Sequence, residues 1–529
     1  MTTRPGSLFA GTVTKYVLLL FNIAAGIVLM PFTVAHLGRS QYGLWMLVAS
    51  MTTYFQLLDI GYGNGVVRHL VEADAKDDVD EVNCIASTFV IVYAIIGVVT
   101  LLLTVCLMVW VVPHFPHLTP EDVRIARFVI AILAARVAVG FPMTVFGAVT
   151  NARQGFVLNN TVAIAVVAAN ALITYLVLRA GFGLLVLVAM TTAVNVLGYV
   201  GYAATARHVF PALHISTRRF RADRWREVTA FSIWMFVIDI AVQIGFNIDN
   251  LVIGAAMSTA AIAIYAVALR LSEYQRRFCD QFSGMLFPVA VSLGAQGDTQ
   301  GLRTVMIEGT RATTLLGAAA MLCLIGFGGP LIHAWMGPGF DDSLGALIAL
   351  AVASAILVAH APMNKVLIAR RRHRMVAATW IGESLINLVL SVALVRRFGL
   401  TGVAIGTALP LAVGHLGILL PAACRAVDVT LPAAIRQMFG PALGGLVTGT
   451  IGAAIIRTAV RGPSSFRLVL AELALTVATY AVGVLLLGSN RRMRQEYWTQ
   501  FKTCVESMAA VIGRRPLTPP AALEPSCRG

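Results

Sequence analysis

Long apolar runs separated by short polar segments recur along the whole chain. A run of about 18 or more residues crosses a hydrocarbon core roughly 30 Å thick as an α-helix. Lipid offers the backbone no hydrogen-bond partners, so such runs predict helices, whereas a membrane barrel would alternate polar and apolar residues. We predict an all-α polytopic membrane protein with about 14 transmembrane helices. The predicted spans are 14–36, 43–67, 84–112, 125–149, 157–178, 184–206, 229–256, 262–288, 312–334, 344–368, 376–395, 401–423, 437–456 and 468–489.

The composition supports a membrane environment. The chain is 58% hydrophobic and 12% charged, with a mean hydropathy of +0.81, and a soluble protein of this balance would lack polar surface. The net charge of +15 is better explained by arginines that flank membrane helices than by nucleic-acid binding, so no nucleic-acid partner is expected. The seven cysteines are scattered and predict neither a metal site nor a disulfide frame. The first apolar run has full length and predicts a retained helix.

The distribution of Lys and Arg predicts the orientation. About three quarters of those outside the spans fall on the side that holds both termini. Because cytoplasmic segments carry an excess of positive charge, we predict that both termini are cytoplasmic. The basic segment 457–467 argues weakly in the opposite direction.

An internal repeat predicts the domain organisation. Trp45 and Tyr265 have similar surroundings at an offset of 220 residues, and Pro142-Met143 and Pro362-Met363 share that offset. Two matches at one offset, with a repeated span pattern, predict two six-helix lobes. The predicted units are an N-lobe at 1–206, a basic cytoplasmic linker at 207–228, a C-lobe at 229–424, two further helices within 425–490, and a cytoplasmic tail at 491–529.

The second span ends in an unusual segment, FQLLDIGYGNGVVRHL at 55–70. Thr52, Gln56, Asp59 and Gly63 would share one face of a continuous helix. The glycines at 61, 63 and 65 permit close packing or a local break. Two interpretations of Asp59 remain open: a carboxylate that points into the protein, or a cap at the interface with its head in water.

The eighth span carries a charged stripe. Arg270, Glu273, Arg277 and Asp280 follow at helical spacing, with Arg276 beside them. A charge at the bilayer centre costs about 3 kcal/mol on insertion scales. Such residues should face a hydrated cavity or pair with each other, as Arg270–Glu273 and Arg277–Asp280 could. A salt-bridge ladder with only a packing role is the alternative.

Other polar residues inside predicted spans of both lobes indicate a shared hydrated cavity. The basic candidates suit an anionic group such as a phosphate: Arg136, Arg270, Arg276, Arg277 and Lys365. The candidates for ion coupling or for polar cavity lining are Asp59, Asp239, Asn247, Asp249, Glu273, Asp280, Glu383 and Asn387. Among these, Asp239, Asp249 or Glu383 could bind a proton or a driving cation. We find no catalytic motif, metal-ligand spacing or nucleotide-binding loop, so neither enzymatic activity nor a cofactor is expected.

The early part of the chain resembles bacterial polysaccharide transporters, the Wzx-type O-antigen and exopolysaccharide flippases of the multidrug/oligosaccharidyl-lipid/polysaccharide (MOP) exporter superfamily. The resemblance rests on a motif spread over the first two spans. Its residues are Leu37-Gly38, Tyr42-Gly43-Leu44, Leu57-Leu58-Asp59, Gly61, Gly63 and Arg68. It implies a bacterial inner-membrane protein that flips an undecaprenyl-pyrophosphate-linked oligosaccharide by rocking two lobes. It also implies coupling to an H⁺ or Na⁺ gradient, contact with membrane lipid and work beside a polysaccharide polymerase.

Two departures concern other branches of the superfamily. The first span lacks the arginines expected near the cavity of a lipid II flippase, and it lacks the acid that multidrug exporters often carry there. A cation-coupled exporter of small molecules remains the alternative function. A membrane glycosyltransferase would need a large outside loop with catalytic carboxylates, and the predicted outside loops are short.

Overall fold

The computed structural model describes residues 5–59, 61–460, 465–489 and 494. Within these ranges the regular secondary structure is helical throughout. The long helices are α1 (Pro5–Thr53), α3 (Val79–Cys106), α4 (Pro120–Ala152), α5 (Phe156–Arg179), α6 (Leu184–Val209), α7 (Ala222–Ala256), α8 (Thr259–Gln296), α9 (Thr299–Met336), α10 (Ser343–Ala369), α11 (His373–Ala412), α14 (Gly440–Ala459) and α15 (Phe466–Gly483). Shorter helices are α2 (Tyr62–Asp74), α12 (Leu420–Ala426) and α13 (Leu431–Met438), together with the 3₁₀ turns η1 (Tyr54–Asp59), η3 (Val112–His114) and η4 (Thr217–Arg219) and the π turns η2 (Leu107–Val111), η5 (Val413–Leu419) and η6 (Val484–Gly488).

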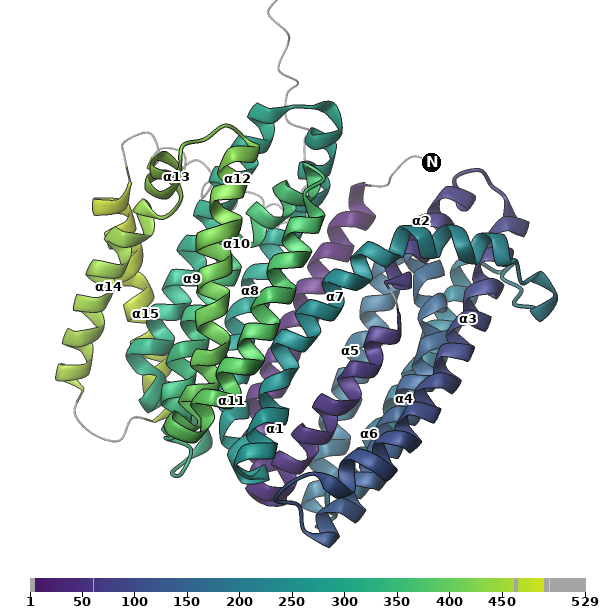
Figure 1. The fold of residues 1–529 in the computed structure, drawn as a ribbon, viewed down its shortest axis with the longest axis horizontal. Coiled ribbons are helices and arrows are strands. Elements are labelled where there is room, and N and C mark those ends of the chain that lie inside the picture. The colour runs from purple at the N-terminus through teal and green to yellow at the C-terminus, as the bar shows by residue number, and fades with distance from the viewer. Residues whose placement is uncertain (1–4, 60, 461–464, 490–493, 495–529) are drawn as a thin grey trace, which may run out of the picture.

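The long helices form two bundles that approach each other at the end of the molecule opposite the N-terminus (Figure 1). We call α1–α6 the N-bundle and α7–α12 the C-bundle. Within the N-bundle α3 packs on α4, and α6 on α4 and α5; within the C-bundle α10 packs on α8, α9 and α11. Helix α1 packs on both α5 and α8 and so connects the two bundles. The boundaries of the predicted domains stay predictions.

Helices α14 and α15 form an outer pair that packs on α9. The short helix α13 precedes them and lies at the same end of the molecule as the N-terminus (Figure 1). This pair corresponds to the last two predicted spans.

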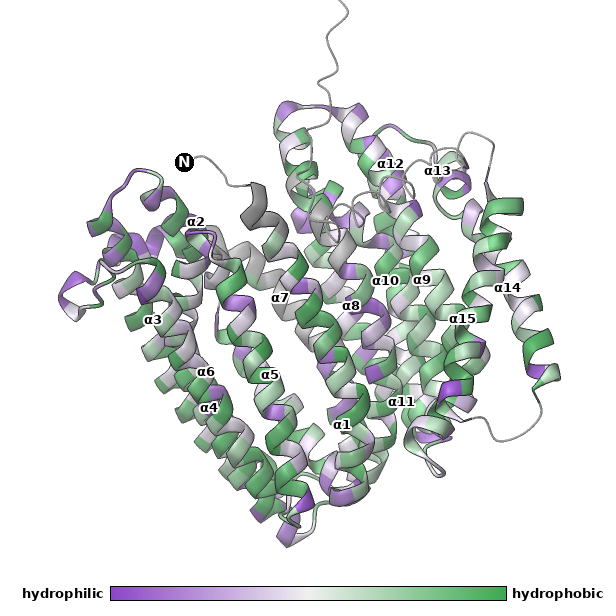
Figure 2. Ribbon diagram, turned by 180° about the vertical axis from the view of Figure 1, so that it is seen from behind, coloured by the Kyte–Doolittle hydropathy of each residue, from purple (hydrophilic) through white to green (hydrophobic). Residues whose placement is uncertain are grey.

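The protein is a multi-pass membrane protein. Ten described stretches are long and apolar enough to span a membrane, and they contain or largely overlap all of the predicted spans except the seventh and eighth. Those two correspond to α7 and α8. Helix α8 carries the charged stripe, and most side chains in the apolar part of α7 lie outside the described residues. Hydrophobic residues predominate along most of the long helices (Figure 2), as a membrane environment requires.

Two glycines turn the chain between spans without a loop. Gly38 has φ 78° and ψ 161° inside α1, and Gly399 has φ 55° and ψ −134° inside α11. Both conformations are strained for residues with a Cβ atom. The first and second predicted spans are therefore joined by a sharp corner at Gly38, and the eleventh and twelfth by one at Gly399.

Of the two alternatives for the glycines of the second span, close packing or a local break, the structure contains the break. Helix α1 gives way to the 3₁₀ turn η1, Gly61 adopts a left-handed conformation with φ 69°, and α2 begins at Tyr62. The prediction that Thr52 to Gly63 share one face of a single helix was wrong, because three different conformations follow one another here. The repeat does not extend to this feature, since α8 continues without a break through its charged stripe.

Candidate functional site

A charged cavity of about 570 Å³ lies mainly against the C-bundle. Its lining comes from α1, α7, α8, α10 and α11. The lining residues are Thr53, Asn247, Leu269, Glu273, Arg276, Arg277, Asp280, Leu357, Ala361, Asn364 and Trp380. Arg276 lies about 26 Å from the first residue of α8, a helix about 57 Å long, so this cavity lies near the middle of α8. We call it the charged cavity.

The stripe on α8 is only partly paired in the predicted way. Arg270 Nη1 lies 3.2 Å from Glu273 Oε2, as expected. Arg277 Nη2 lies 3.5 Å from the same Glu273 oxygen, so the predicted Arg277–Asp280 pair was wrong. Spacings of three and of four residues both bring side chains together on a helix, and Arg277 turns back toward Glu273. Glu273 thus holds two guanidinium groups, and Asp280 is exposed beside the cavity.

The other predicted basic residues do not line the charged cavity. Lys365 follows Asn364, which lines the cavity, but its own Nζ donates a hydrogen bond to Ser283 Oγ at 2.5 Å. Arg270 lies where α8 meets α1, beside Tyr42. Arg136 is on α4 in the N-bundle, near Tyr199. The predicted basic set is therefore divided among four places.

Asp249 and Asn387 meet in a second, buried group. Tyr265 Oη donates to Asp249 Oδ2 at 2.6 Å, and Thr407 Oγ1 lies 2.9 and 3.1 Å from the two carboxylate oxygens. The Asn387 side chain hydrogen-bonds the same carboxylate, and Ser391 Oγ donates to Asn387 Oδ1 at 2.8 Å. Asp249 is 2% exposed. We call these residues the Asp249 cluster.

The Asp249 cluster adjoins the charged cavity. A narrow, partly enclosed void of about 20 Å³ is lined by residues of both, among them Asp249, Thr407, Glu273 and Arg276. This volume is enough for one water molecule or a bare cation. Among the described residues Asp249 has no salt-bridge partner, and an unneutralised buried carboxylate costs several kcal/mol. The arrangement suits binding of a proton or a small cation.

Glu383 belongs to a third group, formed with two histidines. His415 Nδ1 lies 3.0 Å from Glu383 Oε1, and both side chains are buried. The His360 ring lies edge-on to the His415 ring at 5.3 Å between centroids. Glu383 Oε2, His415 Nε2 and His360 Nε2 have no hydrogen-bond partner among the described residues.

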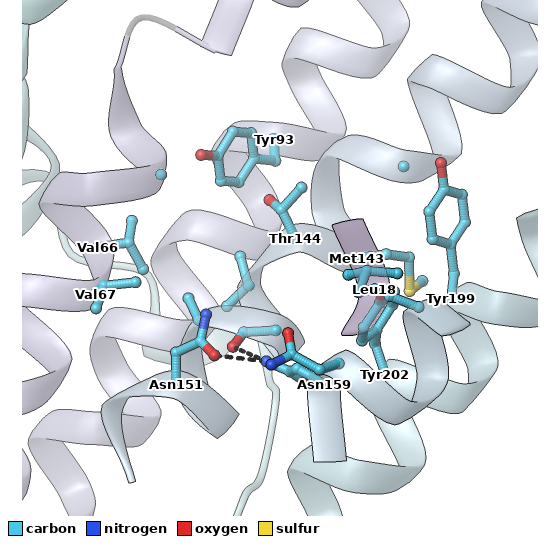
Figure 3. A pocket seen from close by; sticks show the side chains of 17 residues that line it. Leu18, Val66, Val67, Tyr93, Met143, Thr144, Asn151, Asn159, Tyr199 and Tyr202 are labelled. Atoms are coloured by element: carbon cyan, nitrogen blue, oxygen red, sulfur yellow. Dashed lines mark hydrogen bonds between the residues drawn. The ribbon is translucent and has the colours of Figure 1, made fainter. Parts of the chain in front are cut away.

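Asp59 lies beside a neutral polar pocket in the N-bundle. Its carboxylate accepts a hydrogen bond from Tyr93 Oη, so the inward-pointing interpretation describes it better than a cap in water. The pocket has a volume of about 500 Å³ and contains tyrosine, threonine and asparagine side chains but no charged lining residue. Asn159 donates to Asn151 Oδ1 at 2.8 Å across its floor (Figure 3).

The two bundles are closed against each other at the end opposite the N-terminus. Ser40 Oγ lies 3.0 Å from Thr259 Oγ1, and Asn250 donates to Ser50 Oγ at 2.7 Å. Gly43 lies so close to the Thr259 carbonyl that no Cβ atom would fit between them. We call these contacts of α1 with α7 and α8 the closed end.

Sequence reasoning missed the partners of the predicted acids. Tyr265, Thr407, His415 and Tyr93 were not assigned to any site. His415 had a usable signal, because a histidine inside the apolar run LAVGHLGILL is a functional candidate by its location. Asp239 lies on α7 outside the residues whose side chains the structure describes.

Sequence comparison places the chain among proteins of polysaccharide biosynthesis. Residues 10–293 match the family described as "Polysaccharide biosynthesis protein". The chain is 23% identical over 418 residues to the uncharacterized membrane protein EpsK of Bacillus subtilis, covering 76% of this chain and 80% of EpsK. It is 30% identical over 182 residues to the probable flippase AglR of Haloferax volcanii. The matched segment covers 32% of this chain and 36% of AglR.

Solved structures agree on the fold. The lipid II flippase MurJ in an inward closed conformation superimposes with a TM-score of 0.70 at 13% identity, over 89% of this chain and 97% of MurJ. An inward-facing multidrug resistance MATE transporter of the MOP superfamily gives a TM-score of 0.66 at 13% identity, over 79% of this chain and 99% of that chain. At this identity the likeness establishes a shared fold, which is that of the superfamily indicated by the sequence motif.

Proposed function

Because the chain belongs to the polysaccharide biosynthesis protein family, we propose that it flips an undecaprenyl-pyrophosphate-linked oligosaccharide across the bacterial inner membrane. The product would serve synthesis of O-antigen, exopolysaccharide or capsule. The observation that carries the proposal is the placement of Arg276 and Arg277 in a cavity within the helix bundle. Guanidinium groups bind phosphate oxygens through charge-assisted hydrogen bonds, so this cavity suits a pyrophosphate headgroup.

The neutral N-bundle pocket suits the sugars of the same substrate. Tyrosine, threonine and asparagine side chains supply hydrogen-bond donors and acceptors without charge. An uncharged glycan needs this kind of surface, whereas a cationic drug would favour an acidic one. The division into a charged cavity and a neutral pocket therefore supports a lipid-linked oligosaccharide over a small cationic molecule.

We propose that a proton or Na⁺ drives the transport through the Asp249 cluster. The carboxylate is buried, has only neutral donors around it and adjoins a void that is shared with Arg276. Binding of a cation there would neutralise Asp249 and alter the field at Arg276, which joins the ion site to the headgroup site. The closed end would separate when the two bundles rock, giving alternating access.

A deletion strain tests the proposed function. We expect loss of surface polymer, accumulation of lipid-linked repeat units on the cytoplasmic face, and recovery of both when the gene is returned. The glycan profile and the pool of lipid-linked units are the measurements. Unchanged polymer together with new sensitivity to cationic drugs would instead identify a small-molecule exporter.

Removal of both cavity arginines should impair export. In the deletion strain, the double variant Arg276→Ala with Arg277→Ala is expected to lower surface polymer at least about tenfold, since two charge-assisted contacts to phosphate contribute more than 1.4 kcal/mol together. Arg396→Ala is the matched control, because Arg396 is exposed at another helix position and does not line this cavity. Equal polymer in the double variant and the control, at equal protein in the membrane, would remove the arginines from the headgroup site.

A further inference from the structure

A second pocket with basic lining residues lies at the edge of the C-bundle, where the outer helices meet α9. Its volume is about 660 Å³. It is formed by α9, α13, the start of α14 and the end of η6. The lining residues are Arg311, Pro432, Ala433, Arg436, Gln437, Gly440, Pro441, Leu487 and Gly488. We call it the outer pocket. It shares no lining residue with the charged cavity.

Arg311 forms the fixed base of the outer pocket. Arg311 is 7% exposed. Its Nε donates a hydrogen bond to the Gln437 carbonyl at 3.0 Å, and its Nη1 donates one to Glu308 Oε2 at 2.7 Å. Its Nη2 has no hydrogen-bond partner among the described residues, and Arg311 lines the pocket. A buried guanidinium held on two sides with one nitrogen unused is well arranged to bind an anionic oxygen.

Helix α13 lines the outer pocket with Pro432, Ala433, Arg436 and Gln437 and carries exposed apolar residues beside the pocket. Ala434 and Met438 are buried against the C-bundle, whereas Leu431 and Ile435 are 38% and 45% exposed on another face. Arg436 is exposed and lines the pocket. A short helix with separate apolar and basic faces, at the end of a membrane bundle, is typical of a segment that lies in the interface between lipid tails and headgroups.

The opposite wall has the same character. Leu487 of η6 lines the outer pocket and is 67% exposed. Arg494 donates to the carbonyls of Leu486 and Ser489 at 3.0 and 3.1 Å, so it covers the negative end of η6 with a positive charge. Glu308 offsets one charge, so the described charged residues named here are positive overall.

We propose that the outer pocket binds the phosphate headgroup of an anionic glycerophospholipid, in the leaflet on the side of the N-terminus. Arg311 Nη2 and Arg436 would hold the phosphate, and the acyl chains would lie along Leu431, Ile435 and Leu487. The exposed side chains of Leu431, Ile435 and Leu487 favour an amphiphile, because a free phosphate ion has no apolar surface to bury against them. The lipid would connect the outer pair to α9. This assignment does not depend on the proposed transport activity.

Native mass spectrometry of the purified full-length protein tests the site. Delipidated protein is titrated with phosphatidylglycerol and with phosphatidylcholine of the same acyl chains. We expect selective binding of phosphatidylglycerol, and a loss of at least about fivefold in its affinity for Arg436→Ala, as removal of one interfacial charge implies. Arg425→Ala is the matched control, because Arg425 is exposed on neighbouring α12 and does not line the pocket.

Competitors identify the source of the phosphate. Inorganic pyrophosphate should displace phosphatidylglycerol poorly, and so should a polyprenyl phosphate, whose single linear chain does not match a two-chain lipid. The proposal is overturned if either competitor binds more tightly than phosphatidylglycerol, if phosphatidylcholine binds equally well, or if Arg436→Ala behaves like Arg425→Ala. Arg311→Ala, with thermal unfolding measured alongside, should also lose the selectivity while the protein remains folded.

Discussion

Export of surface polymer is expected to fall to the level of the deletion strain when Asp249 is replaced by Asn. The substitution keeps the shape of the side chain and removes its negative charge. Tyr265 and Thr407 can still hydrogen-bond the amide oxygen, so the fold should survive. A carboxamide cannot take up a proton at physiological pH, and it binds cations weakly. The bundles would then lack the ion-dependent step that resets them.

Stability measurements separate an ion site from a structural role. If Asp249 binds the driving ion, the thermal stability of the wild type should rise with Na⁺ or with falling pH, because ligand at a hundredfold excess over Kd adds about 2.7 kcal/mol. Asp249→Asn should abolish this response while its own stability is equal or higher, since a buried charge has been removed. Asp223→Asn is the control, because Asp223 is exposed on the same helix. A variant that keeps half of the export would exclude Asp249 as the coupling residue.

The second large effect is expected at the closed end. In Gly43→Val the new side chain would overlap the backbone of Thr259. A backbone carbonyl cannot move aside as a flexible side chain can, so α1 and α8 must separate. The structure shown here would lose its closed end, and the balance of states would shift toward opening on that side. We expect export to drop by at least about tenfold, because a strain of roughly 1.4 kcal/mol already shifts a two-state equilibrium tenfold.

Cysteine crosslinking measures this separation directly. In a background without the native cysteines, Ser40→Cys with Thr259→Cys should form a disulfide readily, because the two native hydroxyl oxygens are 3.0 Å apart. The addition of Gly43→Val should slow crosslinking strongly. Gly382→Val is the matched control, since a Cβ atom on that helical glycine meets no other atom within 4 Å. Unchanged crosslinking and export in Gly43→Val would contradict the prediction, because they would show that the Gly43–Thr259 contact is not needed for the closed end or for export.

Much of the helical architecture follows from hydrophobic run length, because a membrane leaves the backbone few alternatives. The apolar windows predicted the long helices, and the glycines at 61, 63 and 65 indicated either close packing or a break in the second span. The two corners at Gly38 and Gly399 were predicted only as short connections, since one residue with positive φ leaves no trace in a hydropathy pattern.

The sites were less predictable, because their members come from helices far apart in the sequence. Asp249 was a clear candidate as an acid in an apolar run, but its partner Thr407 lies 158 residues away. A single threonine in a membrane helix usually bonds its own backbone, so nothing in the sequence distinguishes Thr407. The charged stripe showed which residues share a face of α8. It could not show that Glu273 would hold both Arg270 and Arg277.

The corners at Gly38 and Gly399 have a consequence for how the protein meets its surroundings. Where two spans join through one glycine, antibodies, proteases and inserted epitope tags find no loop to engage. The described connections at 180–183, 257–258 and 337–342 are short as well. If this end faces the cell exterior, as the charge distribution predicts, the protein offers little to an immune system or a bacteriophage. A reporter inserted after Gly38 would disrupt the closed end itself, and one at 337–342 would disturb the contacts of Arg39 with Pro338 and Phe340. Topology mapping should therefore use the connection at 180–183, where all four residues are exposed.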